Sequence, residues 1–210
     1  MDICIFANGQ INDYGFVLKR IKNCGYIIAC DGGLNHIANL DLVPDIIIGD
    51  GDSADEVLLK NYIKKGILFE SHPADKNDTD LALSMAHALR LNPSSITIYG
   101  ALGGRPDHQL ANIHVLHMAL KKGVNAAIVD EQTYIVLVGD RVIIEKKDYE
   151  YISLIPMTTE ASGITTNNLL YPLMDETLMI GTTRGISNKF AQSPAIISIK
   201  QGILAVICAK

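Results

Sequence analysis

The sequence has no long hydrophobic run and none of the marks of a secreted protein. No segment approaches the roughly 20 apolar residues that a membrane-spanning helix needs. The first residues, MDICIFANG, carry an acid at the second position and only a brief apolar stretch, unlike a signal peptide with its basic start and long apolar centre. We therefore expect no membrane partner and a cytoplasmic location.

Basic runs, tryptophan and paired cysteines are also missing. The 18 Lys and Arg residues are scattered and the net charge is −5, which argues against a nucleic-acid partner. The four cysteines show neither a C-x-x-C pair nor zinc-finger spacing, so we expect buried thiols in a reducing compartment. Without tryptophan, any stacking on a ligand must come from Tyr or Phe. These absences leave a small molecule as the expected substrate.

The first 130 residues alternate short apolar runs with helical patterns. The runs are ICIFANG, YIIACDGG, DIIIGDGDS, GILFESHP, SITIYGALGG and NAAIVDE, each the length of a buried strand. Apolar spacing predicts helices over 80–90, capped by Asp78 or Thr79, and over 107–122. Repeated strand and helix predict a doubly wound, mostly parallel α/β sheet with helices on both faces, spanning residues 1–130.

The pattern changes after about residue 130. YIVLVGDRVIIE, YISLIP, SGITTNN, ETLMIG and AIISIKQGILAVIC are strand-like and joined by tight turns at 138–141 and 200–202, with no amphipathic helix between them. Residues 131–210 are therefore predicted to form an all-β sandwich. A domain of roughly 80 residues is small enough to lean on the first domain or on a second copy.

Acidic residues follow several of the predicted parallel strands. Ligands of such sheets collect at the carboxyl ends of the strands, and Asp31, Asp50, Asp52 and Asp80 all fall there. In an extended chain the side chains of Asp50 and Asp52 would leave the same face, roughly 6 to 7 Å apart, and would repel each other without a cation between them. Asp45, at the start of its strand, is expected to be structural.

Hard carboxylate oxygens suit Mg²⁺, so Asp50, Asp52 and Asp80 are predicted to hold it, with ordinary turn chemistry as the alternative. The segment GALGGR, residues 100–105, offers glycine N–H groups and the Arg105 fork to a phosphate. It is neither a Walker motif nor G-x-G-x-x-G. Asp107 is a candidate site residue whose alternative is a helix cap.

Two other functions compete with that of a metal-dependent enzyme acting on a phosphate compound. Haloacid-dehalogenase phosphatases also place GDG after a strand, but they need a nucleophilic Asp two residues before a second Asp, and Ala29 stands there relative to Asp31. A non-catalytic nucleotide sensor, in which the β domain would bind a partner protein, is the second alternative, although a sensor has little use for three metal-binding acids.

The ordered set of motifs resembles the thiamine pyrophosphokinase family along essentially the whole chain. It comprises CDGG (30–33), PDIIIGDGDS (44–53), KNDTDLALSMA (76–86), GALGGRPDHQLANI (100–113), SLIP (153–156) and RGISN (184–188). The resemblance implies an α/β domain followed by a β-sandwich. It also implies Mg²⁺-dependent transfer of a diphosphate from ATP to thiamine, with AMP as the other product.

The resemblance assigns roles in the first domain. Asp50, Asp52 and Asp80 match the metal-binding acids, and Asp31 matches another acid of the active site. The positions around the ATP phosphates and the reacting hydroxyl match Lys76, Thr79, Gly103, Gly104, Arg105 and Asp107. His108, whose alternative is a surface or packing role, is included among the candidate substrate-binding residues. Asp31 and Asp107 both stay open as the base that accepts the hydroxyl proton.

The second domain is implied to bind thiamine. Ser187 and Asn188 match residues that hold the pyrimidine ring, and Tyr171 matches an aromatic near it. Family members are homodimers whose sites lie between one chain's α/β domain and the partner's β domain. The sequence departs from the family at Gly51, where a bulky apolar residue is usual and a looser loop is expected, and at NNLLY, residues 167–171.

Overall fold

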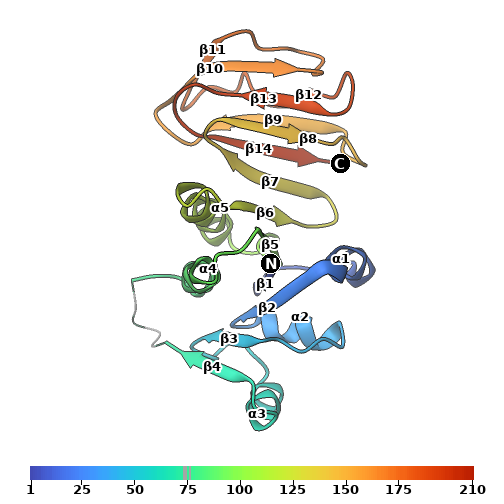
Figure 1. Ribbon diagram of the computed structural model, residues 1–210, viewed down its shortest axis with the longest axis vertical. Helices are drawn as coiled ribbons and strands as arrows, with labels where there is room; N and C mark the ends of the chain where they lie inside the picture. Colours follow the sequence, from blue (N-terminus) through green and yellow to red (C-terminus); the bar gives the residue numbers. More distant parts are fainter. Residues whose placement is uncertain (73–74, 76) are drawn as a thin grey trace. The chain divides into compact units, whose positions relative to one another are not determined.

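The computed structural model describes residues 1–72, 75 and 77–210. These residues form two compact units, Met1–Glu131 and Gln132–Lys210 (Figure 1).

The first unit is built on a six-stranded parallel sheet with the order β6-β5-β1-β2-β3-β4. Its strands are β1 (Asp2–Phe6), β2 (Cys24–Cys30), β3 (Ile46–Gly49), β4 (Leu68–Ser71), β5 (Ser95–Tyr99) and β6 (Asn125–Val129). Each coincides with one of the six apolar runs, and all four residues of β3 are buried, as expected for a strand covered on both faces.

Helices cover both faces of this sheet, which confirms the predicted α/β class. They are α1 (Tyr14–Arg20), α2 (Gly33–Asn39), α3 (Glu56–Lys64), α4 (Asp80–Arg90) and α5 (Pro106–Lys121), with a short 3₁₀ turn over Ile21–Asn23. α1 and α2 lie on one face, and α4 and α5 on the other (Figure 1).

The two predicted helix starts have different outcomes. Thr79 caps α4, because its hydroxyl accepts the N–H of Ala82 at 3.2 Å. The alternative that Asp107 caps α5 is wrong, since Arg105 is the N-cap residue, Pro106 opens the helix and Asp107 lies within the first turn.

The strand order reverses between β1 and β5, and the chains leaving these strands touch there. Gly9 N–H donates to Gly100 O at 2.6 Å, and Gln10 N–H donates to Leu102 O at 2.9 Å. A Cβ at Gly9 would lie 2.4 Å from both carbonyl oxygens, so only glycine permits this approach. A reversal of this kind opens a crevice at the carboxyl edge of the sheet.

The second unit consists of two antiparallel sheets, with the orders β12-β9-β14-β7 and β11-β10-β13-β8. The strands are β7 (Thr133–Val138), β8 (Arg141–Ile144), β9 (Tyr151–Pro156), β10 (Glu160–Asn167), β11 (Glu176–Met179), β12 (Asn188–Lys189), β13 (Ala195–Ser198) and β14 (Leu204–Ala209). The turns at 138–141 and 200–202 each join strands of different sheets, which confirms the predicted sandwich.

The four cysteines, all among the described residues, form no disulfide; Cys4, Cys30 and Cys208 are buried and Cys24 is half-buried. Asp45 accepts the N–H of Ile27 on its Oδ2 at 2.7 Å and so ties the start of β3 to β2, in keeping with a structural role. Among the described residues, no helix has both the length and the apolar character needed to cross a membrane.

Candidate active site

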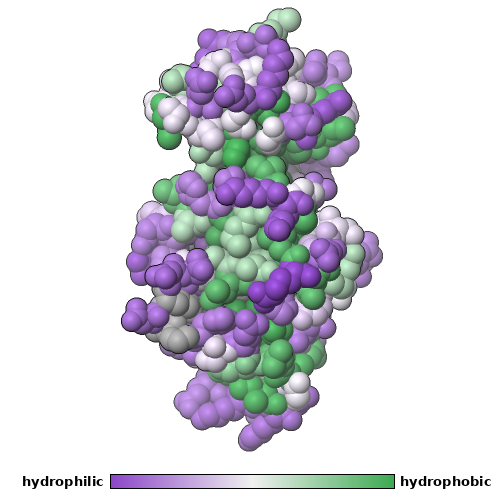
Figure 2. Space-filling model, turned by 60° about the vertical axis from the view of Figure 1, so that its left-hand side comes forward, coloured by the Kyte–Doolittle hydropathy of each residue, from purple (hydrophilic) through white to green (hydrophobic). Residues whose placement is uncertain are grey.

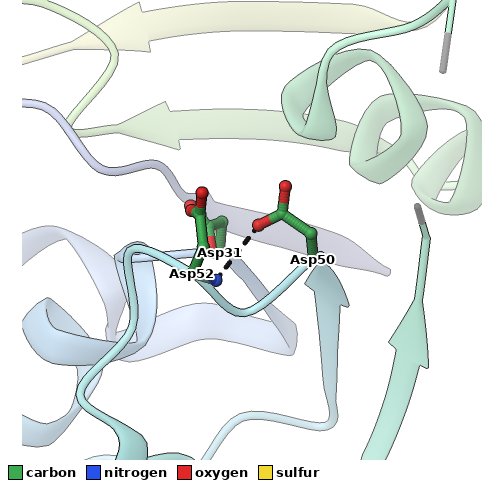
Figure 3. A group of neighbouring side chains, drawn as sticks. All are labelled: Asp31, Asp50 and Asp52. Carbon is green, nitrogen blue, oxygen red and sulfur yellow. Dashed lines mark hydrogen bonds between the residues drawn. The ribbon is translucent and has the colours of Figure 1, made fainter. Parts of the chain in front are cut away.

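Three carboxylates converge at the carboxyl edge of the first unit's sheet. Asp31 follows β2, and Asp50 and Asp52 follow β3, which pairs with β2 in parallel. One oxygen from each of the three lies within 4.8 Å of the other two, and their side chains rise toward the same space (Figure 3). Oxygens this close repel one another unless a positive charge offsets them.

Asp31 is held in a conformation and an environment that few carboxylates occupy. Its φ is 48°, in the left-handed region that Asp tolerates better than most residues. The side chain is 8% exposed, and within the described part of the chain its Oδ1 has no hydrogen-bond partner. Burial raises the pKa of Asp31, and the charges of the nearby Asp50 and Asp80 raise it further. A buried oxygen without a partner in a cluster of acids fits a cation ligand.

Asp50 and Asp52 converge through a turn. The expectation of an extended chain between them is wrong, because Gly51 has a φ of 80° and the N–H of Asp52 donates to Asp50 Oδ1 at 3.1 Å (Figure 3). This is the local side-chain to backbone bond by which Asp stabilises turns. A Cβ at Gly51 would lie 3.1 Å from a methyl carbon of Leu59 and 3.2 Å from the ring of Phe69. The left-handed φ and these close contacts therefore favour glycine at position 51.

The loop that carries these acids is braced by α2. The side-chain amide of Asn35 donates to Ser53 O at 3.4 Å, and its Oδ1 accepts the N–H of Asp55 at 3.1 Å. The hydroxyl of Ser53 donates to Asp52 Oδ1 at 2.9 Å. These bonds connect the acid loop to the helix that begins just after Asp31, so they help to fix the spacing within the trio.

The three acids open into a cavity of about 650 Å³ formed by the segments that follow the first five strands. Of the predicted site residues, the cavity brings together Asp31, Asp50, Asp52, Thr79, Asp80, Gly104, Arg105 and His108. Asp80 lines the cavity, although the close trio contains Asp31 in its place. Gly103 and Asp107 belong to the same loop and helix start, but are not among the lining residues. Lys76 lies outside the described residues.

The glycine loop and Arg105 form one wall of the cavity. Gly100 and Gly103 have φ values of 66° and 81°, and a Cβ at Gly103 would meet Gln10 at 2.8 Å, whereas Gly104 has open space around it. Arg105 binds Asp107 with both Nε (3.2 Å) and Nη2 (2.6 Å). The hydrogen bond from Arg105 lowers the pKa of Asp107. Both side chains are exposed, so an anion can replace Asp107 at little cost.

Tyr171 and Asn188 line a smaller cavity of about 270 Å³ in the second unit. The buried Asn188 side chain holds the backbone of Tyr171, accepting its N–H at 3.0 Å and donating to its carbonyl at 2.7 Å. Tyr171 as a residue remains 64% exposed. Ser187 is not among the lining residues, and its N–H donates to the hydroxyl of Ser153.

Several lining residues of the larger cavity were not predicted. Asn8 and Gly9 follow β1, and extending the strand-end rule to the first apolar run would have found them. Gln109 and Asn112 lie within α5, where no spacing distinguishes them from ordinary polar helix residues.

Comparisons with known proteins agree with the motifs. Residues 17–128 match the family described as "Thiamin pyrophosphokinase, catalytic domain", and residues 141–204 match "Thiamin pyrophosphokinase, vitamin B1 binding domain". A similar protein is the thiamine pyrophosphokinase of Bacillus subtilis (strain 168), 31% identical over 182 residues that cover 86% of this chain and 85% of the relative.

Solved structures agree as well. A crystal structure of thiamine pyrophosphokinase from Bacillus subtilis superposes with a TM-score of 0.90 at 28% identity, covering 100% of this chain and 99% of the other. The Geobacillus thermodenitrificans thiamin pyrophosphokinase gives 0.86 at 26% identity, covering 100% and 98%. The chain therefore belongs to the thiamine pyrophosphokinase family, with its catalytic and vitamin B1 binding domains.

Proposed function

We propose that this protein transfers a diphosphate from ATP to the hydroxyl of thiamine and releases AMP. The observation that carries the proposal is the single cavity in which an acidic trio with an unpartnered buried oxygen faces a glycine loop and an arginine. Residues 1–130 are assigned to ATP and Mg²⁺ binding and catalysis, and residues 131–210 to thiamine binding. The matched segments 17–128 and 141–204 support this division.

The acids fit Mg²⁺, which prefers hard oxygen ligands and usually retains several waters. Asp50 and Asp52 would hold it together with Asp80, the predicted third ligand, and the proximity of Asp31 to this pair makes Asp31 a further candidate. When bound, the ion neutralises charge on phosphate oxygens during transfer.

The chain's own residues supply alignment and further charge. Arg105 would exchange Asp107 for a phosphate, and the N–H groups of the glycine loop would bind other phosphate oxygens. Thr79 and His108 line the same cavity, within reach of the substrate. The main catalytic contribution of the protein would be to hold the thiamine hydroxyl in line with the β-phosphorus of ATP. Asp31 and Asp107 are the two candidate bases for the hydroxyl proton.

The second unit would hold thiamine through Tyr171, Ser187 and Asn188. Its exposed large apolar side chains include Leu170, Met174, Ile180 and Ile186, and hydrophobic residues reach the surface of both units (Figure 2). A partner chain could cover such side chains, and a homodimer with shared active sites is proposed. The four cysteines form no disulfide in the described structure, which accords with the proposed cytoplasmic location.

The test is to mix purified protein with ATP, Mg²⁺ and thiamine and to measure AMP and thiamine diphosphate, with EDTA and no-thiamine controls. AMP formed in step with thiamine diphosphate supports the proposal. ADP with thiamine monophosphate would show that the γ-phosphate moves. ATP binding without product would favour the sensor alternative, and phosphate release from phosphate esters without thiamine would favour a phosphatase.

A further inference from the structure

The carbonyl oxygens of the loop after β5 are engaged from two directions. On one side lie the residues that follow β1: Gly9 N–H donates to Gly100 O at 2.6 Å, and Gln10 N–H donates to Leu102 O at 2.9 Å. These two backbone bonds extend the contact between β1 and β5 past the ends of the strands. They do not engage the carbonyls of Ala101 and Gly104, which remain for other donors.

Two side chains of α5 supply those donors. Asn112 Nδ2 donates to Ala101 O at 2.8 Å, and Gln109 Nε2 donates to Gly104 O at 2.8 Å. Both residues are half-buried and line the larger cavity. Four carbonyl oxygens within five consecutive residues are thus held by hydrogen-bond donors.

The N–H groups of the same loop are used differently. In the described part of the chain, no backbone N–H of residues 101–105 donates to another backbone group or to a side chain. In a planar trans peptide the C=O and the following N–H point in opposite directions. Holding Ala101 O and Gly104 O toward α5 therefore turns the N–H groups of Leu102 and Arg105 away from α5. Both of these residues line the cavity.

We propose that Asn112 and Gln109 are positioning residues for phosphate recognition. Their amides hold loop carbonyls, which would repel an anion, and so leave the loop N–H groups to bind the phosphate chain of ATP. A neutral amide does this without a competing charge in the cavity. The inference rests on the proposed function only in taking ATP as the source of the phosphates.

The variants Asn112→Ala and Gln109→Ala each remove one donor, and Asn112→Asp keeps the side chain's size while replacing the donor with an acceptor. His114→Ala, at an exposed position of the same helix, is the matched control. The Kd of ATP with Mg²⁺ is measured by calorimetry in the absence of thiamine. Adenosine and thiamine are titrated as ligands without phosphate.

Each alanine variant is expected to raise the Kd of ATP about three- to tenfold, the effect of one net hydrogen bond. The Kd values of adenosine and thiamine, and all values for His114→Ala, should stay within about twofold of wild type, the scatter expected of a change away from the site. In ¹⁵N-labelled wild type, the amide signals of Leu102, Gly104 and Arg105 should shift on addition of ATP, and Asn112→Ala should reduce these shifts.

The inference is overturned if both alanine variants bind ATP within twofold of wild type, or if the Kd values of thiamine and ATP rise together. If circular dichroism shows that Asn112→Ala does not fold, the ATP Kd values of Asn112→Asp and Gln109→Ala are used in its place. If the wild type binds ATP but forms no thiamine diphosphate, the proposed function is refuted. The role of Asn112 and Gln109 is then decided by the Kd values of ATP alone. A wild type that binds no ATP refutes both.

Discussion

Replacing Asp31 by Asn should stabilise the protein in the absence of metal while removing its response to Mg²⁺. The oxygens of Asp31, Asp50 and Asp52 lie within 4.8 Å of one another. Each pair at that distance costs about 1 kcal/mol in bulk water and about 3.5 kcal/mol at an effective dielectric constant near 20. Because Asp52 is exposed and Asp50 half-buried, the lower part of this range applies. Relieving two pairs should therefore add about 1 to 2 kcal/mol to the free energy of unfolding.

Thermal unfolding with EDTA or with Mg²⁺ measures both effects. For a chain of this size the gain raises Tm by about 2 to 8 °C in EDTA. Wild type should gain stability as Mg²⁺ is added, whereas Asp31→Asn should lose most of that gain. Asp41→Asn is the matched control, because Asp41 also has a left-handed φ, 54°, and is exposed away from the trio. The change in Tm of Asp41→Asn measures any stabilisation that Asn provides at a left-handed φ, and it is subtracted from the change for Asp31→Asn.

Two results would refute this reasoning. One is an Asp31→Asn protein that is less stable than wild type in EDTA by more than about 1 kcal/mol, which would mean that the fold stabilises the Asp31 carboxylate more than the neighbouring acids destabilise it. The other is an Asp31→Asn protein with an undiminished Mg²⁺-dependent rise in Tm, which would place the ion elsewhere.

Three further outcomes are expected. Gly103→Ala should lower the free energy of unfolding in urea by about 1 to 2 kcal/mol because Gly103 has a left-handed φ. Gly104→Ala should unfold like wild type, because a Cβ at Gly104 would meet open space; equal losses in the two variants would show that the left-handed φ of Gly103 is not the cause. Asp52→Asn should keep a wild-type circular dichroism spectrum and lose turnover by orders of magnitude; a near wild-type rate would contradict the metal assignment. Asn188→Ala should lower the free energy of unfolding by about 1 to 3 kcal/mol and raise the KM for thiamine more than that for ATP, since it removes two part-buried hydrogen bonds to the backbone of Tyr171; unchanged stability would show that these two bonds do not stabilise the fold.

Much of the fold can be predicted from the sequence, because parallel strands that are buried on both faces consist of nearly continuous apolar residues. All six runs became strands of the first unit's sheet, in keeping with the burial of residues such as Ile47 and Ile98. The two-residue strand β12 was not predicted, since its pairing with β9 depends on tertiary contact and leaves no periodic pattern.

The candidate site was predictable as far as strand ends determine it. The acids after β2, β3 and β4 were found because their position follows from the sheet alone. The turn between Asp50 and Asp52 was not, since Gly51 permits both an extended and a left-handed φ and the local sequence does not distinguish between them. The hydrogen bond of the Asn112 amide was not predicted either, because its partner, Ala101 O, lies 11 residues away and no local pattern connects the two.

The position of β14 in the second unit has a consequence for the order in which the protein matures on the ribosome. β14, Leu204–Ala209, lies between β7 and β9 and pairs with both along its length. During synthesis, β7 and β9 must therefore wait with open edges until residue 209 has left the exit tunnel. The first unit has all of its strands by residue 129 and can close its sheet much earlier. Nascent chains stalled at about residue 200 should thus carry a folded first unit and a second unit that is still sensitive to proteases.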